Sequence, residues 1–136
     1  MSSILNDIKL QYRIGGISSK LIIWNVIIFL ISIVFYSFKT GIFDFPNWIA
    51  LSSQPSVVLT RPWTLISYAF LHQGFWHLFF NMIVLNFSGR LFLTFFTQKQ
   101  LFGLYILSAI FAGLCFILGY YLLEGTSTIV GASAAI

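Results

Sequence analysis

The fold is decided by the stretch LFGLYILSAIFAGLCFILGYYLL, which occupies residues 101–123 and holds no charged residue. As an α-helix it would extend roughly 35 Å at about 1.5 Å per residue, enough to cross the hydrocarbon core of a bilayer. Its small residues would let neighbouring backbones approach closely: Gly103, Ser108, Ala109, Ala112, Gly113 and Gly119. The stretch therefore predicts a transmembrane helix that packs against other helices.

The whole chain has the same apolar character. Of its 136 residues, 59% are hydrophobic and 7% are charged, and 16 are phenylalanines; soluble domains carry about 25% charged residues. The net charge of +4 comes from scattered basic residues, which excludes a nucleic-acid-binding patch. A single cysteine, Cys115, excludes an intrachain disulfide. We expect one domain of an all-α integral membrane protein.

Two further apolar segments and the last residues complete the predicted helical bundle. Residues 21–38, between Lys20 and Lys39, are long enough to span a bilayer. Residues 75–96 form another predicted span, and residues 129–136 are the expected start of a fourth helix. The chain is thus expected to carry three transmembrane helices and the beginning of a fourth.

The connection at residues 39–71 is expected to lie at the membrane interface. It holds all three prolines of the chain and many aromatic residues, so we expect short helices partly within the headgroup layer. Residues 1–20 are polar and are predicted to form an N-terminal segment outside the membrane, followed by a membrane domain over residues 21–136.

The distribution of basic residues predicts the orientation of the chain. With the N-terminus inside, five basic residues face the cytoplasm and two, Lys39 and Arg61, face outward. The positive-inside rule favours this arrangement, which places Ser133 towards the outer face. The chain has no Arg- and Ser-rich leader, which favours a bacterial plasma membrane over an organelle. The five inner residues are Lys9, Arg13, Lys20, Arg90 and Lys99.

Polar residues within the predicted second span are candidates for function, because polar groups are costly in a membrane. His77 and Asn81 are four residues apart, so they share one face of a helix, one turn apart. Two donors on one face could bind a developing negative charge. Hydrogen bonds to neighbouring helices are an equally weighted alternative.

Ser133 lies in the segment Gly131-Ala132-Ser133-Ala134, where small neighbours leave room for a substrate carbonyl. If a helix begins near Ser133, its free N–H groups would favour an oxyanion. A serine that merely caps the helix is the alternative.

Three other polar or aromatic residues have structural interpretations. His72 and His77 are five residues apart and would point in different directions on a helix, and no carboxylate lies nearby, so no metal site or cofactor is predicted. His72 is expected to support local structure. Arg61 and Trp63, separated by one proline, are typical of an interfacial anchor.

Taken together, these motifs resemble the rhomboid family of intramembrane serine proteases. The run RPWTLISYAFLH at residues 61–72 is similar to the family's loop between its first two helices. It leads into WHLFFNM at residues 76–82, which resembles the family's His-x-x-x-Asn motif, and residues 131–134 resemble its Gly-x-Ser-x motif. The resemblance covers residues 20–136 and implies a rhomboid-like helical bundle.

The resemblance also implies roles. Ser133 would be the nucleophile, and His77, Asn81 and the Ser133 N–H would form the oxyanion hole. The supporting residues would be His72, Arg61, Trp63 and Gly131. The reaction would cleave a peptide bond in or beside a transmembrane segment of a membrane-protein substrate, near the outer face, with a histidine of the family's sixth helix as general base.

The sequence departs from the family in ways that keep alternatives open. No histidine follows Ser133, so the chain alone is expected to be inactive, as a fragment of a longer product or a degenerate copy. Ala134 stands where the family often has glycine, and the end of the predicted second helix, Arg90-Leu91-Phe92-Leu93-Thr94, lacks the acidic residue expected there. A rhomboid-like pseudoprotease that binds transmembrane clients is the main alternative, and a small transporter or channel component is a third. The oligomeric state is not predicted.

Overall fold

The structure, a computed structural model, describes residues 6–7, 9–10, 12, 16–38 and 41–136. Half of the predicted N-terminal segment lies outside these residues, as do Arg13 and Lys39, which entered the orientation argument.

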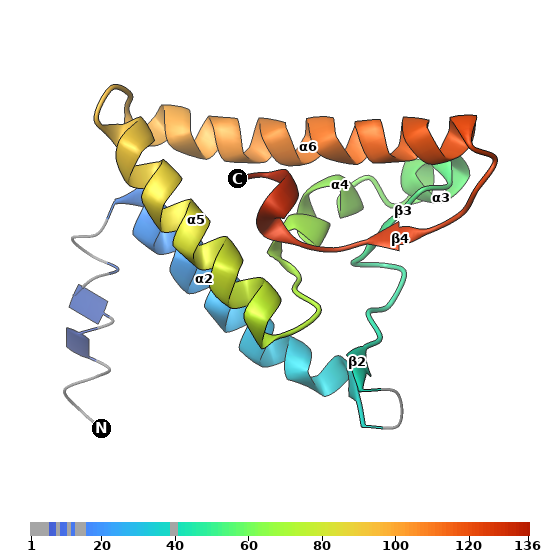
Figure 1. Ribbon diagram of the computed structural model, residues 1–136, viewed down its shortest axis with the longest axis horizontal. Coiled ribbons are helices and arrows are strands. Elements are labelled where there is room, and N and C mark those ends of the chain that lie inside the picture. Colours follow the sequence, from blue (N-terminus) through green and yellow to red (C-terminus); the bar gives the residue numbers. More distant parts are fainter. Residues whose placement is uncertain (1–5, 8, 11, 13–15, 39–40) are drawn as a thin grey trace.

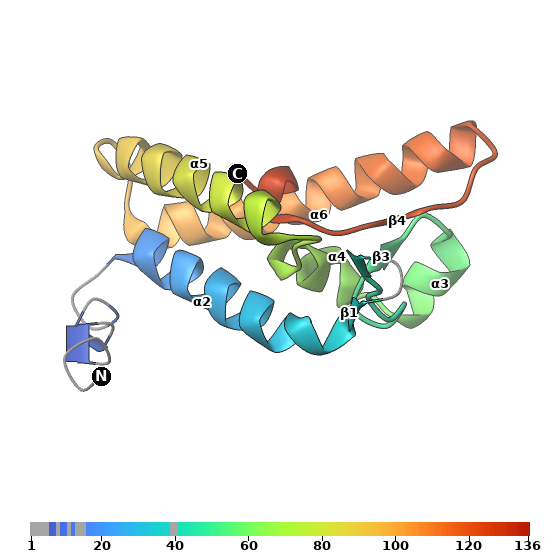
Figure 2. The same ribbon diagram turned by 60° about the horizontal axis from the view of Figure 1, so that its bottom comes forward.

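Three long helices dominate the described part of the chain: α2 (Ile17–Ser32), α5 (Phe75–Leu93) and α6 (Gln98–Leu122). Helices α2 and α5 run side by side, and α6 extends from the end of α5 across the molecule (Figures 1 and 2). The C-terminal segment returns between α5 and α6 (Figure 1). The predicted mostly helical architecture is therefore confirmed.

Two of the described helical segments are long and apolar enough to cross a membrane, Ile17–Phe35 and Gln98–Leu122. Helix α5 has a suitable length, but His77, Asn81, Asn86 and Arg90 lower its hydropathy. Two of the three predicted spans thus have matching helices, and the span at α5 remains a prediction.

The first helix differs from the predicted span at residues 21–38. It begins at Ile17, before Lys20, and after Ser32 it continues as a short 3₁₀ helix, η1 (Ile33–Phe35). The chain then forms a hairpin of β1 (Tyr36–Ser37) and β2 (Ile42–Phe43). The helix can begin before Lys20 because lysine is compatible with a helix interior. It ends early because aromatic rings of the two strands pack together, with the centroids of Tyr36 and Phe43 5.2 Å apart.

The second and third helices differ from their predicted limits by a few residues. Helix α5 ends at Leu93 and not at residue 96, and α6 begins at Gln98 and not at residue 101. A capping box explains the start of α6: the Gln100 N–H donates to the Thr97 hydroxyl over 3.3 Å, and the Thr97 N–H donates to Gln100 Oε1 over 2.8 Å.

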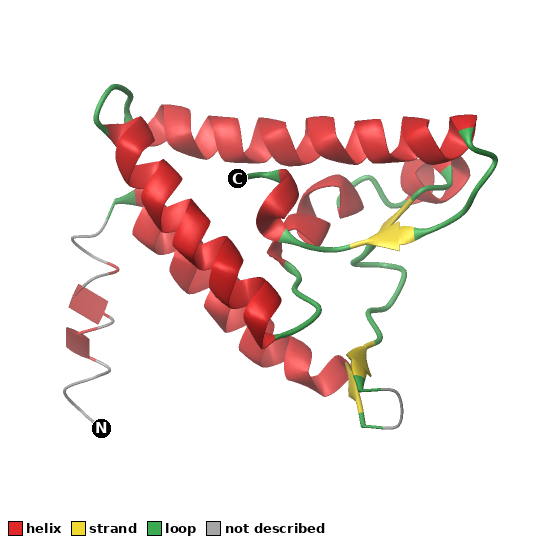
Figure 3. Cartoon of the chain, in the orientation of Figure 1, coloured by secondary structure: helices red, strands yellow, loops and turns green. Residues whose placement is uncertain are grey.

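The aromatic connection before α5 contains the expected short helices. These are α3 (Pro55–Thr60), α4 (Thr64–Ser67) and the 3₁₀ helix η2 (Tyr68–Phe70). It also contains β3 (Leu51–Ser52), which pairs antiparallel with β4 (Thr128–Ile129) after α6 (Figure 3). The two short sheets are additions to the predicted all-α fold.

Close backbone contact occurs at two glycines of the long helices. A Cβ atom added at Gly89 of α5 would lie 2.6 Å from Ser18 Oγ of α2, and one added at Gly113 of α6 would lie 2.9 Å from Leu51 Cδ2. Beside Gly103 and Gly119 no described atom lies within 4 Å of such a Cβ. The small-residue packing predicted for α6 is thus present at Gly113, whereas Gly103 and Gly119 face open space among the described residues.

A buried network of hydrogen bonds joins α2, α6 and η2. Asn25 Nδ2 donates to the Leu21 carbonyl over 2.8 Å and to the Tyr105 hydroxyl over 3.5 Å, and that hydroxyl donates to the Ala69 carbonyl over 3.3 Å. Such interhelical hydrogen bonds contribute to association where lipid gives no hydrophobic driving force. The remaining faces of the long helices are apolar and exposed, as in a protein surrounded by lipid.

Candidate active site

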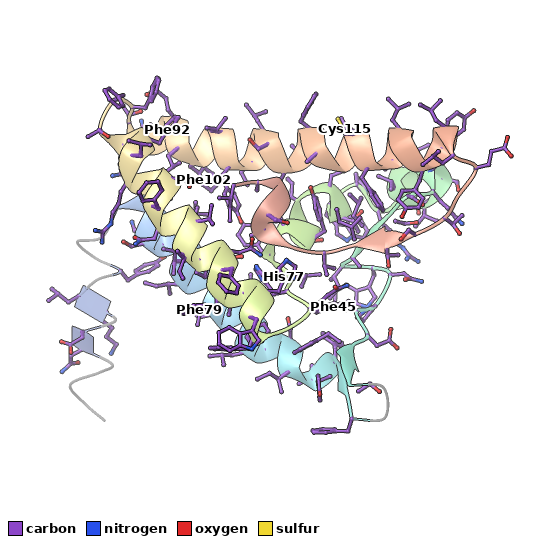
Figure 4. All side chains as sticks on the ribbon, viewed as in Figure 1. Phe45, His77, Phe79, Phe92, Phe102 and Cys115 are labelled. Atoms are coloured by element: carbon purple, nitrogen blue, oxygen red, sulfur yellow. The ribbon has the colours of Figure 1, made fainter. Side chains whose placement is uncertain are left out.

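The candidate site lies between the first turns of α5 and the C-terminal segment. His77 points from α5 towards that segment (Figure 4). Asn81 follows one turn later and is buried, and its Nδ2 has no hydrogen-bond partner among the described residues. An unpaired buried amide is costly, so Asn81 carries a donor that is free to bind a ligand.

Gly131 places the C-terminal segment directly against His77. Its φ angle of +135° is one that L side chains rarely adopt. A Cβ atom added there would lie 2.8 Å from His77 Cε1, 2.9 Å from His77 Nε2 and 3.5 Å from Ser133 Oγ. The absence of a side chain at Gly131 therefore lets the C-terminal segment pass directly against the His77 ring, with the Ser133 hydroxyl nearby.

Ser133 lies in a 3₁₀ turn, η3 (Ala132–Ala134), that follows Gly131. The predicted helix start is thus present as a single 3₁₀ turn. The Ser133 side chain is exposed, and its hydroxyl makes no hydrogen bond to another described residue. A hydroxyl on an exposed turn is accessible to a substrate carbonyl.

Tyr68 is a positioning residue that the sequence analysis missed. Its carbonyl accepts the Gly131 N–H over 2.9 Å, and its hydroxyl donates to the Ala109 carbonyl of α6 over 2.7 Å. Burial, with a smaller effect of Tyr105, raises the pKa of the Tyr68 phenol to about 12, so it stays a neutral donor. The signal was present, because a tyrosine in an apolar core needs a partner for its hydroxyl.

The pairing of β3 with β4 fixes the approach to Gly131. Leu51 pairs with Ile129, and the Ser53 N–H donates to the Ser127 carbonyl over 2.9 Å. The Ser127 N–H in turn donates to Ser53 Oγ, also over 2.9 Å. The aromatic connection thus holds the segment that carries Ser133.

His72 lies behind His77 and is fully buried. The prediction that the two rings point apart was wrong: their centroids are 5.2 Å apart in an edge-to-face arrangement. The reason is that His72 precedes the first residue of α5 and does not follow helical geometry. Burial, and then the neighbouring His77, lowers the pKa of the His72 imidazole to about 4.

His72 is thus a neutral ring at physiological pH. Neither of its ring nitrogens has a well-formed hydrogen bond to a described residue. The nearby Phe70 backbone raises the pKa of His72, but by less than burial and His77 lower it. Its edge-to-face contact with His77 supports the ring that borders Gly131.

Arg61 and Trp63 belong to a different surface. The Trp63 indole donates to the Trp48 carbonyl over 2.7 Å, and Arg61 lines an open hollow beside α3. Among the described residues, no three metal-ligating side chains come together. The structure thus groups His77, Asn81, Gly131 and Ser133, with His72 behind them, and leaves Arg61 and Trp63 elsewhere.

Comparison with known proteins agrees with this arrangement. The family model of the Rhomboid domain matches residues 59–136, which is more than half of the chain and includes every residue of the candidate site. Searches of curated proteins and of solved structures found no match. With its apolar helices, the chain is an integral membrane protein. On the family match, it belongs to the rhomboid family.

Proposed function

We propose that the protein is an intramembrane serine endopeptidase in which Ser133 is the nucleophile and α5 supplies the oxyanion hole. The observation that carries this proposal is the contact at Gly131, where an added Cβ atom would lie 2.9 Å from His77 Nε2 and 3.5 Å from Ser133 Oγ. Its substrates are membrane proteins cleaved in or beside a transmembrane segment, near the outer face.

The hydrogen bond at the other side of the His77 ring supports its role as a donor. The Gln73 N–H donates to His77 Nδ1 over 3.4 Å, a long bond but one that assigns Nδ1 as the acceptor. In a neutral imidazole the proton then resides on Nε2, the atom that faces Gly131. This tautomer presents an N–H to an oxyanion and cannot accept the serine proton at Nε2.

Asn81 supports the same role from one turn further along α5. Its Nδ2 is buried and unpaired within the described part of the chain. A substrate oxyanion would give this N–H the acceptor that it lacks, and donors arranged before the reaction stabilise the transition state. We assign His77, Asn81 and the Ser133 N–H to the oxyanion hole, and His72 and Gly131 to supporting positions.

The general base is a separate requirement, because a serine hydroxyl needs one to become nucleophilic at neutral pH. The sequence has two histidines, His72 and His77. His77 is oriented as a donor, and His72 lies behind it. Cleavage by the proposed mechanism therefore needs a further base, which family resemblance assigns to a histidine of the sixth helix.

A client-binding pseudoprotease is the second candidate function. The observation that favours it is that neither histidine of the sequence is positioned as a base for Ser133. Such a protein would bind transmembrane segments at the same face without cutting them.

The membrane topology belongs to the same proposal. We place residues 1–20 in the cytoplasm and residues 21–136 in the membrane domain of a bacterial plasma membrane. Helix α5 is then the second of three spans, between α2 and α6. Its 19 residues are sufficient to cross a bilayer, and its packing beside α2 supports this placement.

The direct test is cleavage of a labelled single-span substrate in proteoliposomes by this chain together with the segment that supplies the general base. We expect cleavage, and its complete loss in Ser133→Ala. Ser127→Ala, on the same segment, is the matched control and should retain activity. Binding of the substrate without cleavage by the native protein would favour the pseudoprotease.

A further inference from the structure

An open polar hollow lies beside α3 and the β3–β4 ribbon. It has a volume of about 650 Å³ and is lined by α3, by the turn before β3 and by the segment after α6. Its polar lining comes chiefly from Gln54, Ser56, Arg61, Thr126, Ser127 and Thr128. Hydroxyl and amide groups thus surround one guanidinium.

Arg61 is the one charged residue among those described that line the hollow, and no carboxylate lines it. Among the described residues the hydrogen bonds of Arg61 come from its backbone, and its guanidinium forms no ion pair there. Hydrogen bonds to other described residues are likewise absent from the hydroxyls of Ser56 and Thr128 and from the side-chain amide of Gln54, whose backbone N–H donates to Ser52 Oγ. The hollow therefore offers a cation and several neutral donors to a single ligand.

The walls of the hollow are held in place without that ligand. Ser52 pairs with Thr128 across the β3–β4 ribbon, and Ser53 and Ser127 exchange two hydrogen bonds of 2.9 Å. Ser53 itself is buried. The donors on the two sides of the ribbon are thus kept at a fixed separation, which lowers the entropic cost of binding.

The side chains around the hollow indicate the depth at which it lies. Trp48 and Trp63 are exposed by 55% and 52%, and Leu59 of α3 by 82%. Exposed tryptophans gather at the level of the lipid headgroups, and an exposed leucine on a short helix inserts into the acyl boundary. Arg61 is then at the depth of the lipid phosphates.

From these observations we propose that the hollow binds the phosphate of an anionic phospholipid headgroup. Arg61 pairs with the phosphate oxygens, and the hydroxyls of Ser56 and Thr128 and the amide of Gln54 donate to the remaining oxygens and the glycerol. A guanidinium matches phosphate geometry with two parallel hydrogen bonds. The site is independent of the proteolytic proposal, because none of these residues borders Ser133.

The test is native mass spectrometry of the 136-residue chain, released from neutral detergent and titrated with phosphatidylglycerol or phosphatidylcholine. We expect one phosphatidylglycerol to bind before any phosphatidylcholine. Arg61→Gln should weaken that first binding about tenfold, as expected for loss of a charge-assisted pair. Arg61→Lys should weaken it less, and Thr128→Val should weaken it a few-fold while keeping the strand.

Arg90→Gln, which removes an exposed charge from the last turn of α5, is the matched control and should leave the first binding unchanged. Helix content by circular dichroism separates a binding defect from misfolding, and Arg61→Lys keeps the test valid if Arg61→Gln does not fold. Equal affinity of Arg61→Gln and the native chain would overturn the proposal. So would tighter binding of inorganic phosphate or of an acidic peptide than of the lipid.

Discussion

Helices α5 and α6 follow one another in the chain, yet they differ in what their polar residues do. In α6 the buried tyrosine Tyr105 bonds to Asn25 and Ala69, so its polar group is satisfied within the protein. In α5 the buried amide of Asn81 has no partner among the described residues, and His77 faces the space beside Gly131. The polar residues of α5 also make it less apolar than α6, so α6 is apolar enough to cross a membrane by composition, and the span at α5 stays a prediction.

The largest expected effect is a loss of cleavage on adding a side chain at Gly131, which lies against His77 of α5. In Gly131→Ala the new methyl would lie 2.8 Å from the His77 ring, at a backbone conformation unfavourable for alanine. We expect cleavage to fall by at least about 100-fold, the size of one lost oxyanion donor. Gly103→Ala of α6, where no described atom lies within 4 Å, should retain full activity. Equal rates in both variants, measured in proteoliposomes, would contradict the placement of the site.

The next effect separates the two asparagines of α5. Asn81→Ala should lower kcat about 10²–10³-fold with little change in KM, because the donor acts on the transition state. Asn86 is exposed and accepts a hydrogen bond from Arg90, so Asn86→Ala should leave kcat within about twofold, as expected of a surface change. A rise in KM with unchanged kcat in Asn81→Ala would indicate substrate binding in place of oxyanion stabilisation.

A smaller effect distinguishes the packed and open faces of the two helices. Gly89→Ala of α5 would place a methyl 2.6 Å from Ser18 Oγ, and such overpacking costs about 1–3 kcal/mol. Gly119→Ala of α6 meets open space and gains helix propensity. Thermal unfolding in detergent should therefore show a lower midpoint for Gly89→Ala and an equal or higher one for Gly119→Ala. The reverse order would mean that α2 and α5 do not pack as described.

The last expected effect is a pH dependence of stability that comes from His72, behind the site. An imidazole in the unfolded chain titrates near pH 6.5, whereas the pKa of folded His72 is about 4. The unfolded state binds more protons between these values, so the free energy of unfolding should fall as pH drops from about 6.5 to 4. The contribution of His72 is fully present above that range. His72→Asn should flatten this decline in a series of thermal melts, and an unchanged slope would contradict the burial of a neutral ring.

The parts of the fold that the sequence allowed us to predict are those encoded locally. A long uncharged run gives α6, and a spacing of four places His77 and Asn81 on one face of α5. The end of α2 could not be predicted in this way, because the mostly apolar residues 33–38 are compatible with a helix and with a strand. Only the ring contacts of the β1–β2 hairpin decide between them.

The site was predictable in its residues but not in its supports. The roles of Ser133, His77 and Asn81 came from motif order, and they remain predictions. The pairing of Leu51 with Ile129 joins two-residue strands that are far apart in sequence and have no local signal. The same holds for the bond from Gly131 to the Tyr68 carbonyl, since any backbone can accept it. His72 was misplaced because the spacing argument put both histidines on one helix, whereas α5 begins after His72, at Phe75.

The most direct measurement of the central claim is covalent labelling with a fluorophosphonate, in membranes, of this chain together with the segment that supplies the general base, followed by peptide mass spectrometry. The account predicts a single adduct on Ser133, formed at a rate that Asn81→Ala lowers strongly and Asn86→Ala does not change. An adduct on another serine, or a rate unaffected by Asn81→Ala, would contradict the claim that α5 stabilises an oxyanion formed at Ser133.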